Sequence, residues 1–230
     1  MCGRYAITVS SLNKLLAQFG VELVEMSETR LPWTPRYNVA PTTTVPAVRN
    51  REDGKRELVQ LRWGLIPPWA KDTKIAYSTI NARADTVATK PAFRSAFKKR
   101  RCLIIADGYY EWRKEGKAKL PLYYQIDGGK PFAFAGLWEW WRDPADKDAE
   151  PIESCTIITT DANELAKQVH DRMPVILDSE DYGAWLACDE IPLVPFDADR
   201  MTATPVSTYV NNVKNQGAQC LASPDDVGAP

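Results

Sequence analysis

The segment PLYYQIDGGKPFAFAGLWEWW, residues 121–141, constrains the fold more than any other part of the chain. Two runs rich in aromatic residues flank the sequence Asp127-Gly128-Gly129. Aromatic side chains favour strands, and aspartate and glycine suit the unusual backbone angles of tight turns. The pattern predicts a β-hairpin, and with it a fold that contains antiparallel sheet.

Most of the other patterned segments are also typical of strands, while helices are predicted to be short and scattered. Because helices do not alternate regularly with strands, the pattern indicates an α+β fold rather than a doubly wound one. Strands are predicted from residue 56 towards Pro67-Pro68, within residues 101–112 with a break at Asp107-Gly108, and from residue 153 onwards. The last of these strands is predicted to run into a helix that ends near residue 169, with Asp161 and Glu164 at capping-box spacing. Further helices are predicted within residues 9–20 and 178–188, and extended or turning chain at residues 32–48.

The charged segment WRDPADKDAEPIES, residues 141–154, is predicted to be a loop within one domain, because a strand pattern resumes directly after it. No repeat or second composition divides the 230 residues. We therefore expect a single domain over residues 1–222, followed by a disordered tail at residues 223–230.

Composition limits the classes of function. The 29 Lys and Arg residues and 30 Asp and Glu residues give a net charge of -1, which gives no argument for a polyanionic partner, although a local basic patch would suffice to bind one. The five cysteines include no C-x-x-C pair, which argues against a disulfide framework and a zinc site. Without a signal peptide or a long apolar run, we expect a soluble cytoplasmic protein without metal, cofactor or membrane partner.

Two aromatic and basic features have both structural and nucleic-acid interpretations. The eight tryptophans suit a core, or they suit stacking on bases. WGLIPPW, residues 63–69, is a stiff turn in the core or an apolar wedge against bases. The basic run KPAFRSAFKKRR, residues 90–101, is most simply a solvated helix face.

Several side chains are candidates for chemistry. His170, the only histidine, lies on a turn beside charged residues, where it is an ordinary surface residue or a proton carrier. Glu111 faces solvent, or it points inward, where its aromatic neighbours would raise its pKa and suit it to act as a general acid. Asn81 and Arg83 share a strand face, which suits either a phosphate-bearing ligand or a structural pair.

Cys2 carries the most specific chemistry. Removal of Met1 would leave Cys2 with a free α-amine beside its thiol, with ordinary pKa values of about 8 and 8.5. The amine can form a Schiff base with an aldehyde, and the thiol can then close a five-membered thiazolidine. An internal cysteine cannot react in this way, because its nitrogen is part of an amide.

The ordered motifs resemble one family. MCGRY, RYNVAPTTTVPAV, RWGLIPPW, INARADT, ADGYYEW, VHDRMPVIL and VNNVKNQG occur in this order from residue 2 to about residue 222. Together they resemble the SRAP (SOS response-associated peptidase) domain family. The resemblance implies a single compact α+β domain with a mostly antiparallel, barrel-like sheet core and short peripheral helices.

The resemblance also implies a function in the response to DNA damage. SRAP proteins act at abasic sites in single-stranded DNA, especially at junctions with duplex, and form a covalent thiazolidine linkage that shields the lesion. It implies that Met1 is removed autocatalytically or by an aminopeptidase, and that the crosslink can reverse through a lyase-like step. We accordingly expect a monomer, nucleoid-associated in a prokaryote or nuclear in a eukaryote.

Residue by residue, the resemblance assigns roles to nine side chains. Cys2 is the nucleophile, Asn81 positions the N-terminus, Glu111 is the general acid and base, and His170 assists ring opening and proton transfer. Family members often carry a second tryptophan where this chain has Ala70. Contacts with DNA are expected from Arg4, Trp69, Arg83, Thr159 and Arg172.

Two other functions remain open at this stage. The same thiol could serve an N-terminal-nucleophile peptidase or amidohydrolase, with the α-amine as base. The chain could instead be a non-catalytic single-strand binder, which would retain DNA affinity without Cys2. Because Cys2 lies at a terminus, we expect it to contribute little to the core and Cys2→Ala to leave the unfolding temperature unchanged.

Overall fold

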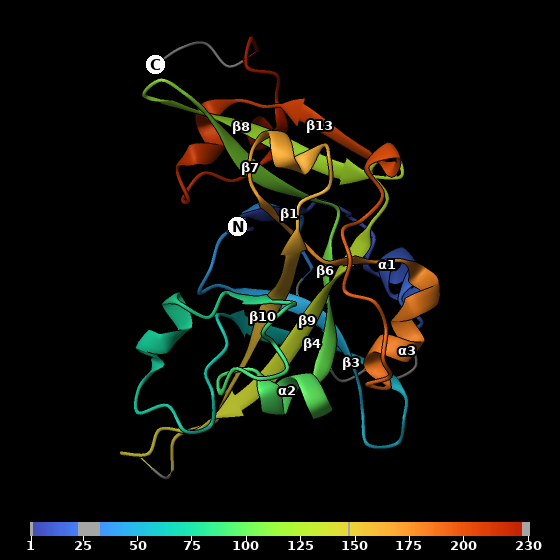
Figure 1. Cartoon of the computed structure of the whole chain (residues 1–230), viewed down its shortest axis with the longest axis vertical. Helices are drawn as coiled ribbons and strands as arrows, with labels where there is room; N and C mark the ends of the chain where they lie inside the picture. Colours follow the sequence, from blue (N-terminus) through green and yellow to red (C-terminus); the bar gives the residue numbers. More distant parts are fainter. Residues whose placement is uncertain (1, 23–32, 147, 227–230) are drawn as a thin grey trace.

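The computed structural model describes residues 2–22, 33–146 and 148–226 (Figure 1). Residues 227–230 of the predicted tail lie outside the described residues, whereas residues 223–226 form a turn closed by the Asp226 amide and the Ser223 carbonyl. Two β-sheets make up most of the molecule, one above the other in Figure 1. No helix in the described ranges is both long and apolar enough to cross a membrane.

The smaller sheet is antiparallel throughout and contains the first strand of the chain. Its order is β13-β8-β7-β1-β2, so β1 is paired on both sides although it follows the N-terminus directly. This double pairing fixes the start of the chain. The strands are β1 (Tyr5–Ile7), β2 (Arg36–Val39), β7 (Gly108–Glu115), β8 (Ala118–Ile126) and β13 (Met201–Pro205).

The larger sheet closes into a barrel. Its ring runs β10-β4-β3-β6-β9, and β9 pairs again with β10, so no open edge remains in the ring. Among these pairings only β10 with β4 is parallel. The expected mostly antiparallel, barrel-like core is confirmed. The ring strands are β3 (Thr44–Asn50), β4 (Arg56–Trp63), β6 (Arg101–Ala106), β9 (Phe132–Trp141) and β10 (Ile152–Asp161).

Three short strands extend the barrel wall near the ends of β9 and β10. β5 (Asn81–Arg83) pairs parallel with β10, β11 (Arg172–Pro174) pairs antiparallel with the end of β10, and β12 (Ile176–Leu177) pairs with β9. β5 and β11 thus pair with the last five residues of β10, and Thr159 pairs with both strands. These two strands carry or adjoin several candidate site residues.

The hairpin predicted over residues 121–141 is wrong, although both of its strands exist. β8 pairs with β7 and β13 in the smaller sheet, while β9 pairs with β6, β10 and β12 in the barrel. Asp127, Gly128 and Gly129 all have positive φ, and the Arg200 guanidinium holds the Asp127 carboxylate at 2.7 and 3.0 Å. This turn carries the chain from one sheet to the other. The actual neighbour of β8 is β7, across the two-residue turn at Gly116 and Lys117.

The short helices agree with the sequence in two cases and differ in a third. α1 (Leu12–Gln18) is capped by Ser11, and α3 (Tyr182–Leu186) follows a 3₁₀ turn. The helix expected near residue 169 is only a 3₁₀ turn, Ala166–Gln168. The capping box does not form, because Asp161 binds Arg172 and Asn163 instead accepts the Ala166 amide. The basic run forms α2 (Arg94–Lys99).

The remaining regular elements are short 3₁₀ turns around the two sheets. They span Thr73–Tyr77, Ala198–Arg200, Thr208–Asn211 and Ala218–Leu221.

Most of the described tryptophans support the core interpretation. Trp63 and Trp185 are fully buried and Trp141 is nearly so. Trp69 is the main exception, with 59% of its surface exposed. The charged segment between β9 and β10 is a loop within one domain, as predicted, because these two strands pair with each other.

Candidate active site at the N-terminus

Cys2 is buried beside the first strand. Its side chain has no exposed surface and belongs to the main core cluster. The Asn81 amide, at the start of β5, donates a hydrogen bond to the Cys2 carbonyl at 2.8 Å. The expectation that Cys2 contributes little to the core is therefore wrong: β1 is paired on both sides, which anchors the residues before it.

Glu111 points inward, towards the N-terminus. Tyr5 pairs with Tyr109, and the Tyr110 amide donates to the Arg4 carbonyl, so the antiparallel register brings Glu111 opposite Gly3. Alternation places Glu111 on the face of Tyr109, which packs in the main core. Only 8% of Glu111 is exposed. Of the two orientations left open by the sequence, the structure shows the buried one.

Burial determines the protonation of both groups. Desolvation raises the pKa of Glu111, and the nearby His170 acts in the opposite direction. Desolvation raises the pKa of the Cys2 thiol, and the negative charge of Glu111 raises it further. The thiol is therefore neutral in this environment, and the Glu111 carboxyl is disposed to hold a proton.

His170 lies between the 3₁₀ turn and β11, and about a third of its side chain is exposed. Its Nδ1 lies 3.0 Å from the Arg172 amide and 2.8 Å from Oδ1 of Asp171. Unprotonated Nδ1 accepts from the amide, whereas protonated Nδ1 donates to the carboxylate. Nδ1 of His170 thus has both a backbone donor and a carboxylate acceptor within hydrogen-bond distance.

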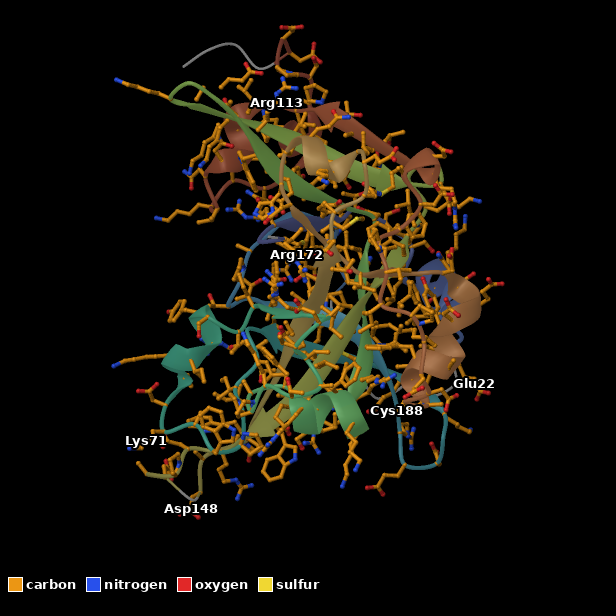
Figure 2. All side chains as sticks on the ribbon, in the orientation of Figure 1. Glu22, Lys71, Arg113, Asp148, Arg172 and Cys188 are labelled. Carbon is orange, nitrogen blue, oxygen red and sulfur yellow. The ribbon has the colours of Figure 1, made fainter. Side chains whose placement is uncertain are left out.

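Arg172 and Thr159 are committed to contacts within the protein. Arg172 lies near the middle of the molecule (Figure 2) and is 8% exposed. Its guanidinium donates to the Asp161 carboxylate at 2.7 Å and to the Thr159 carbonyl at 2.6 Å. Thr159 is fully buried, and its hydroxyl lies 3.5 Å from the Ala82 carbonyl. In this conformation the Thr159 side chain offers no surface to DNA, contrary to expectation.

Arg4 is held by contacts within the protein and also borders a groove. Its Nη1 donates to Asn38 Oδ1 at 2.7 Å and to the Val210 carbonyl at 3.0 Å, and the guanidinium lies 5.5 Å from the Trp112 ring centre. The groove has a volume of about 380 Å³. It is lined by Arg4, Trp112, Lys114, Lys119 and Asn211.

The sequence analysis did not single out Lys114 and Lys119. They form a directly paired position of the β7–β8 hairpin, beside Trp112 and Arg4 in the groove. Recognising the turn at Gly116 would have brought these two lysines together.

The other two predicted DNA contacts are exposed. Arg83 ends β5, lies two residues from Asn81, and pairs with the Asp85 carboxylate at 2.5 and 3.0 Å. Trp69 is exposed beside the buried Ala70. Asn81 and Arg83 share a strand face, as predicted: Asn81 holds the Cys2 carbonyl and Arg83 reaches solvent.

Buried polar atoms near Cys2 are available to a bound molecule. Within the described ranges, Asn81 Oδ1 and the hydroxyls of Tyr5 and Tyr109 are buried without a hydrogen-bond partner. Both tyrosines are close enough to Cys2 for its charge to affect their pKa values. Buried polar atoms without a partner are uncommon in native proteins, so these atoms suit a polar ligand. The described residues contain no cluster of three side chains able to hold a metal ion.

Comparison with known proteins decides the family. The family model described as SOS response associated peptidase (SRAP) matches residues 1–213. The chain belongs to the SRAP family. Within it, two proteins of Bacillus subtilis (strain 168) are similar over nearly their whole length, and both are named abasic site processing proteins. YoqW is 42% identical over 97% of this chain and 100% of its own length, and YoaM 43% identical over 96% and 97%.

A more distant relative and two solved structures are also similar to this chain. The abasic site processing protein HMCES of Gallus gallus is 32% identical over 86% of this chain and 68% of its own. A solved protein from Bacteroides thetaiotaomicron is 29% identical, covers 96% of this chain and 99% of its own, and superposes with a TM-score of 0.81. One from Bordetella bronchiseptica is 28% identical and gives 0.74 over 90% and 100%. The resemblance to the SRAP family and the α+β fold are confirmed.

Proposed function

We propose that this protein binds abasic sites in single-stranded DNA and captures the sugar aldehyde covalently with Cys2 after Met1 is removed. The observation that carries this proposal is the hydrogen bond between Asn81 and the Cys2 carbonyl, with Glu111 buried beside the same residue. A fixed N-terminal 1,2-aminothiol next to a carboxyl group matches the needs of thiazolidine chemistry. Relatives over 40% identical are named for abasic-site processing.

The proposed reaction proceeds in two bond-forming steps. The Cys2 α-amine adds to the aldehyde carbon of the ring-opened sugar, and the resulting carbinolamine loses water to give a Schiff base. The thiol sulfur then adds to the same carbon, and its proton passes to the nitrogen. One carbon–sulfur bond and one carbon–nitrogen bond form, and one water molecule is released.

The protonation states at the site support this order. Because burial keeps the Cys2 thiol neutral, the amine is the better first nucleophile. A protonated Glu111 can donate the proton that the departing water requires, and the resulting carboxylate can accept the proton of the thiol. His170 is placed to exchange protons with solvent, and we assign it the opening of the sugar ring.

The exposed residues suit a path for the DNA strand. Trp69 presents an apolar ring to stack against or separate bases, and Arg83 presents a cation near the Asn81 end of the site. Arg4, Lys114 and Lys119 make a second basic surface around the smaller sheet. We infer that a monomer binds at a junction of single-stranded and double-stranded DNA, with each of these two surfaces contacting one arm of the junction.

Intact mass spectrometry tests the proposal directly. The purified protein should lack Met1 and should gain the mass of an abasic oligonucleotide minus one water, with no adduct on an intact oligonucleotide. Cys2→Ala should abolish the stable adduct. Cys102→Ala is the matched control, because Cys102 is an equally buried cysteine on β6. Each variant should lose about 1 kcal/mol of stability from the emptied thiol site.

The outcomes separate the functions that the sequence left open. A wild-type protein that forms no adduct, or a Cys2→Ala variant that keeps it, would contradict the proposal. Loss of the adduct in both cysteine variants would mean that stability, not chemistry, is responsible. Hydrolysis of a peptide or amide that requires Cys2, without any DNA adduct, would instead support the N-terminal-nucleophile hydrolase.

A further inference from the structure

A second concave surface lies beside α2, which Figure 1 shows at the end of the barrel away from β7 and β8. It is a pocket of about 790 Å³ between α2 and the segment that follows α3. Arg101 lies in it and begins β6, whose six residues span about 20 Å before the chain turns into β7. Figure 2 shows Cys188, which lines this pocket, well apart from Arg172 near the N-terminal site.

Arg101 is a buried cation whose direct hydrogen-bond partners are backbone carbonyls. It is 7% exposed, and its guanidinium donates to the carbonyls of Phe97 at 2.9 Å and Asp189 at 2.6 Å. The aromatic rings of Phe97 and Trp185 lie 4.6 and 4.4 Å from it. No carboxylate in the described parts of the chain lies within ion-pair distance of Arg101; desolvation lowers its pKa, and the nearby Cys188 and Asp189 raise it.

The other buried arginine among the described residues, Arg172, and the partly buried Arg49 both pair with carboxylates. Arg172 pairs with Asp161 at 2.7 Å, and Arg49 pairs with two glutamates at 2.7 Å. Burying an unpaired charge is costly unless an opposite charge compensates it. Arg101 departs from this pattern and opens onto a pocket, which is the arrangement expected of an anion-binding site.

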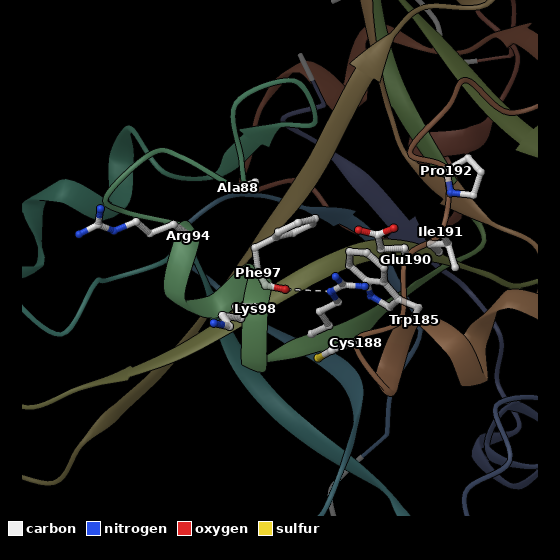
Figure 3. A pocket seen from close by; sticks show the side chains of 10 residues that line it. Ala88, Arg94, Phe97, Lys98, Trp185, Cys188, Glu190, Ile191 and Pro192 are labelled. Carbon is white, nitrogen blue, oxygen red and sulfur yellow. Dashed lines mark hydrogen bonds between the residues drawn. The ribbon is translucent and has the colours of Figure 1, made fainter.

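The other lining residues of the pocket indicate what kind of anion would bind there. Figure 3 shows Arg94 and Lys98 extending from α2 at its edge, and Glu190 is the acidic residue in its lining. Phe97, Ile191 and Pro192 supply apolar surface. The lining therefore combines a net positive charge with apolar walls. This gives the basic run at residues 90–101 a role beyond that of a solvated helix face.

We propose that this pocket binds an acidic segment of a partner protein, with a carboxylate on Arg101 and an apolar side chain against Phe97 and Ile191. Charge complementarity supports an acidic partner, and the open, partly apolar concavity suits a peptide segment. A DNA backbone fits less well, because its phosphates are hydrated and are usually met by exposed cations rather than by a buried arginine in an apolar recess. The site would hold the protein to a partner while Cys2 reacts.

Fluorescence polarisation with a labelled eight-residue peptide tests the proposal. The probe has six Asp and Glu residues followed by Leu and a C-terminal Phe with a free carboxylate; a second probe replaces the acids with Asn and Gln and is amidated. The acidic probe should bind the full-length protein, and the neutral probe should not. Arg94→Glu with Lys98→Glu should weaken binding at least tenfold. Lys117→Glu, on the exposed β7–β8 turn, is the control and should change it less than threefold.

Cys188 provides a reporter of position. It lines the pocket and is half-buried, whereas the other four cysteines are buried. The acidic peptide should slow alkylation of Cys188 by iodoacetamide, measured by peptide mass mapping, and should leave crosslinking to abasic DNA unchanged. Absence of binding at 1 mM peptide, or binding without protection of Cys188, would overturn the proposal. A tenfold loss of single-strand affinity in the Arg94→Glu, Lys98→Glu variant but not in Lys117→Glu would assign the pocket to nucleic acid instead.

Discussion

Glu111 and Cys2 occupy the same buried face where β1 meets β7, and each affects the other. The negative charge of Glu111 opposes ionisation of the thiol, while burial opposes ionisation of Glu111 itself. The folded protein therefore holds a carboxyl group in a position that disfavours its charged form. Such a group costs stability in order to serve a reaction.

The stability cost of Glu111 should appear in a pH series. Its pKa in the folded protein is raised above the ordinary value of 4.5, so the folded state binds its proton more tightly than the unfolded state. As pH rises from about 4.5 through the raised pKa, the wild-type folded state loses stability. The Glu111→Gln variant does not lose it, because its side chain stays neutral. Glu111→Gln should thus unfold at a similar temperature to wild type at pH 4 and at a higher temperature at pH 8, while crosslinking at least tenfold more slowly.

Glu139→Gln is the contrasting variant. Glu139 is 2% exposed and pairs with Arg100 at 2.6 Å, so its charge is compensated. This variant should lower the unfolding temperature at pH 8 and leave crosslinking unchanged. A Glu111→Gln protein that is less stable than wild type at pH 8 would show that the interactions of the Glu111 carboxylate outweigh its desolvation, contrary to the raised pKa.

Strands and turns determine which side chains meet. β5 has three residues, yet its parallel pairing with β10 sets Asn81 against the Cys2 carbonyl and leaves Arg83 in solvent. At the same scale, the three positive-φ residues at 127–129 separate two strands that the sequence pattern predicts to pair. The side chains of a strand are given by its own sequence, but the strands that pair with it come from distant parts of the chain.

Arg83 at the end of β5 should contribute charge to DNA binding without supporting the fold. Arg83→Ala should weaken binding to any single strand and reduce the slope of log affinity against log salt by about 0.7. Fluorescence polarisation at several salt concentrations measures this slope. Arg113→Ala is the matched control, because Arg113 is a similarly exposed arginine paired with Glu115 two residues away. An equal slope for wild type and Arg83→Ala would count against a phosphate contact there.

At the scale of the molecule, Asn38 joins the N-terminal strand to the C-terminal segment. Its Nδ2 lies within 3.2 Å of the carbonyl oxygens of Val210, Asn212 and Asn215, and its Oδ1 accepts from Arg4. Asn38 is 2% exposed. The residues before β1, which include Cys2, thus depend on a segment that lies about 170 residues after Asn38 in the chain.

Removing this connection should disturb the site from a distance. Asn38→Ala removes the Asn38 hydrogen bonds to three carbonyls and one of the two hydrogen bonds of Arg4 Nη1, which should cost about 2–3 kcal/mol, measured by urea denaturation. Crosslinking at a temperature where the variant remains folded should also slow, because the N-terminus is less firmly held. Asn50→Ala, which loses one bond of 3.3 Å to Leu186, should show neither effect. Unchanged stability in Asn38→Ala would refute the role of this junction.

The sequence by itself determined the α+β class, the positions of most strands and the chemistry possible at Cys2. These features follow from side-chain type and local periodicity, which act within a few residues. The ordered motifs also indicated the SRAP family, which the comparisons confirmed.

Tertiary structure alone decided which strands pair, that Cys2 and Glu111 are buried together, and that Arg101 is buried against backbone carbonyls at a pocket. β8 and β9 are adjacent in the chain, but each gains more partners in separate sheets. A carboxyl pKa, likewise, depends on whether water reaches the group, and distant segments determine that. Local sequence preferences limit the secondary structure that a segment can form. The packing of segments far apart in the chain determines the surroundings of Cys2 and Arg101, and those surroundings determine their chemistry.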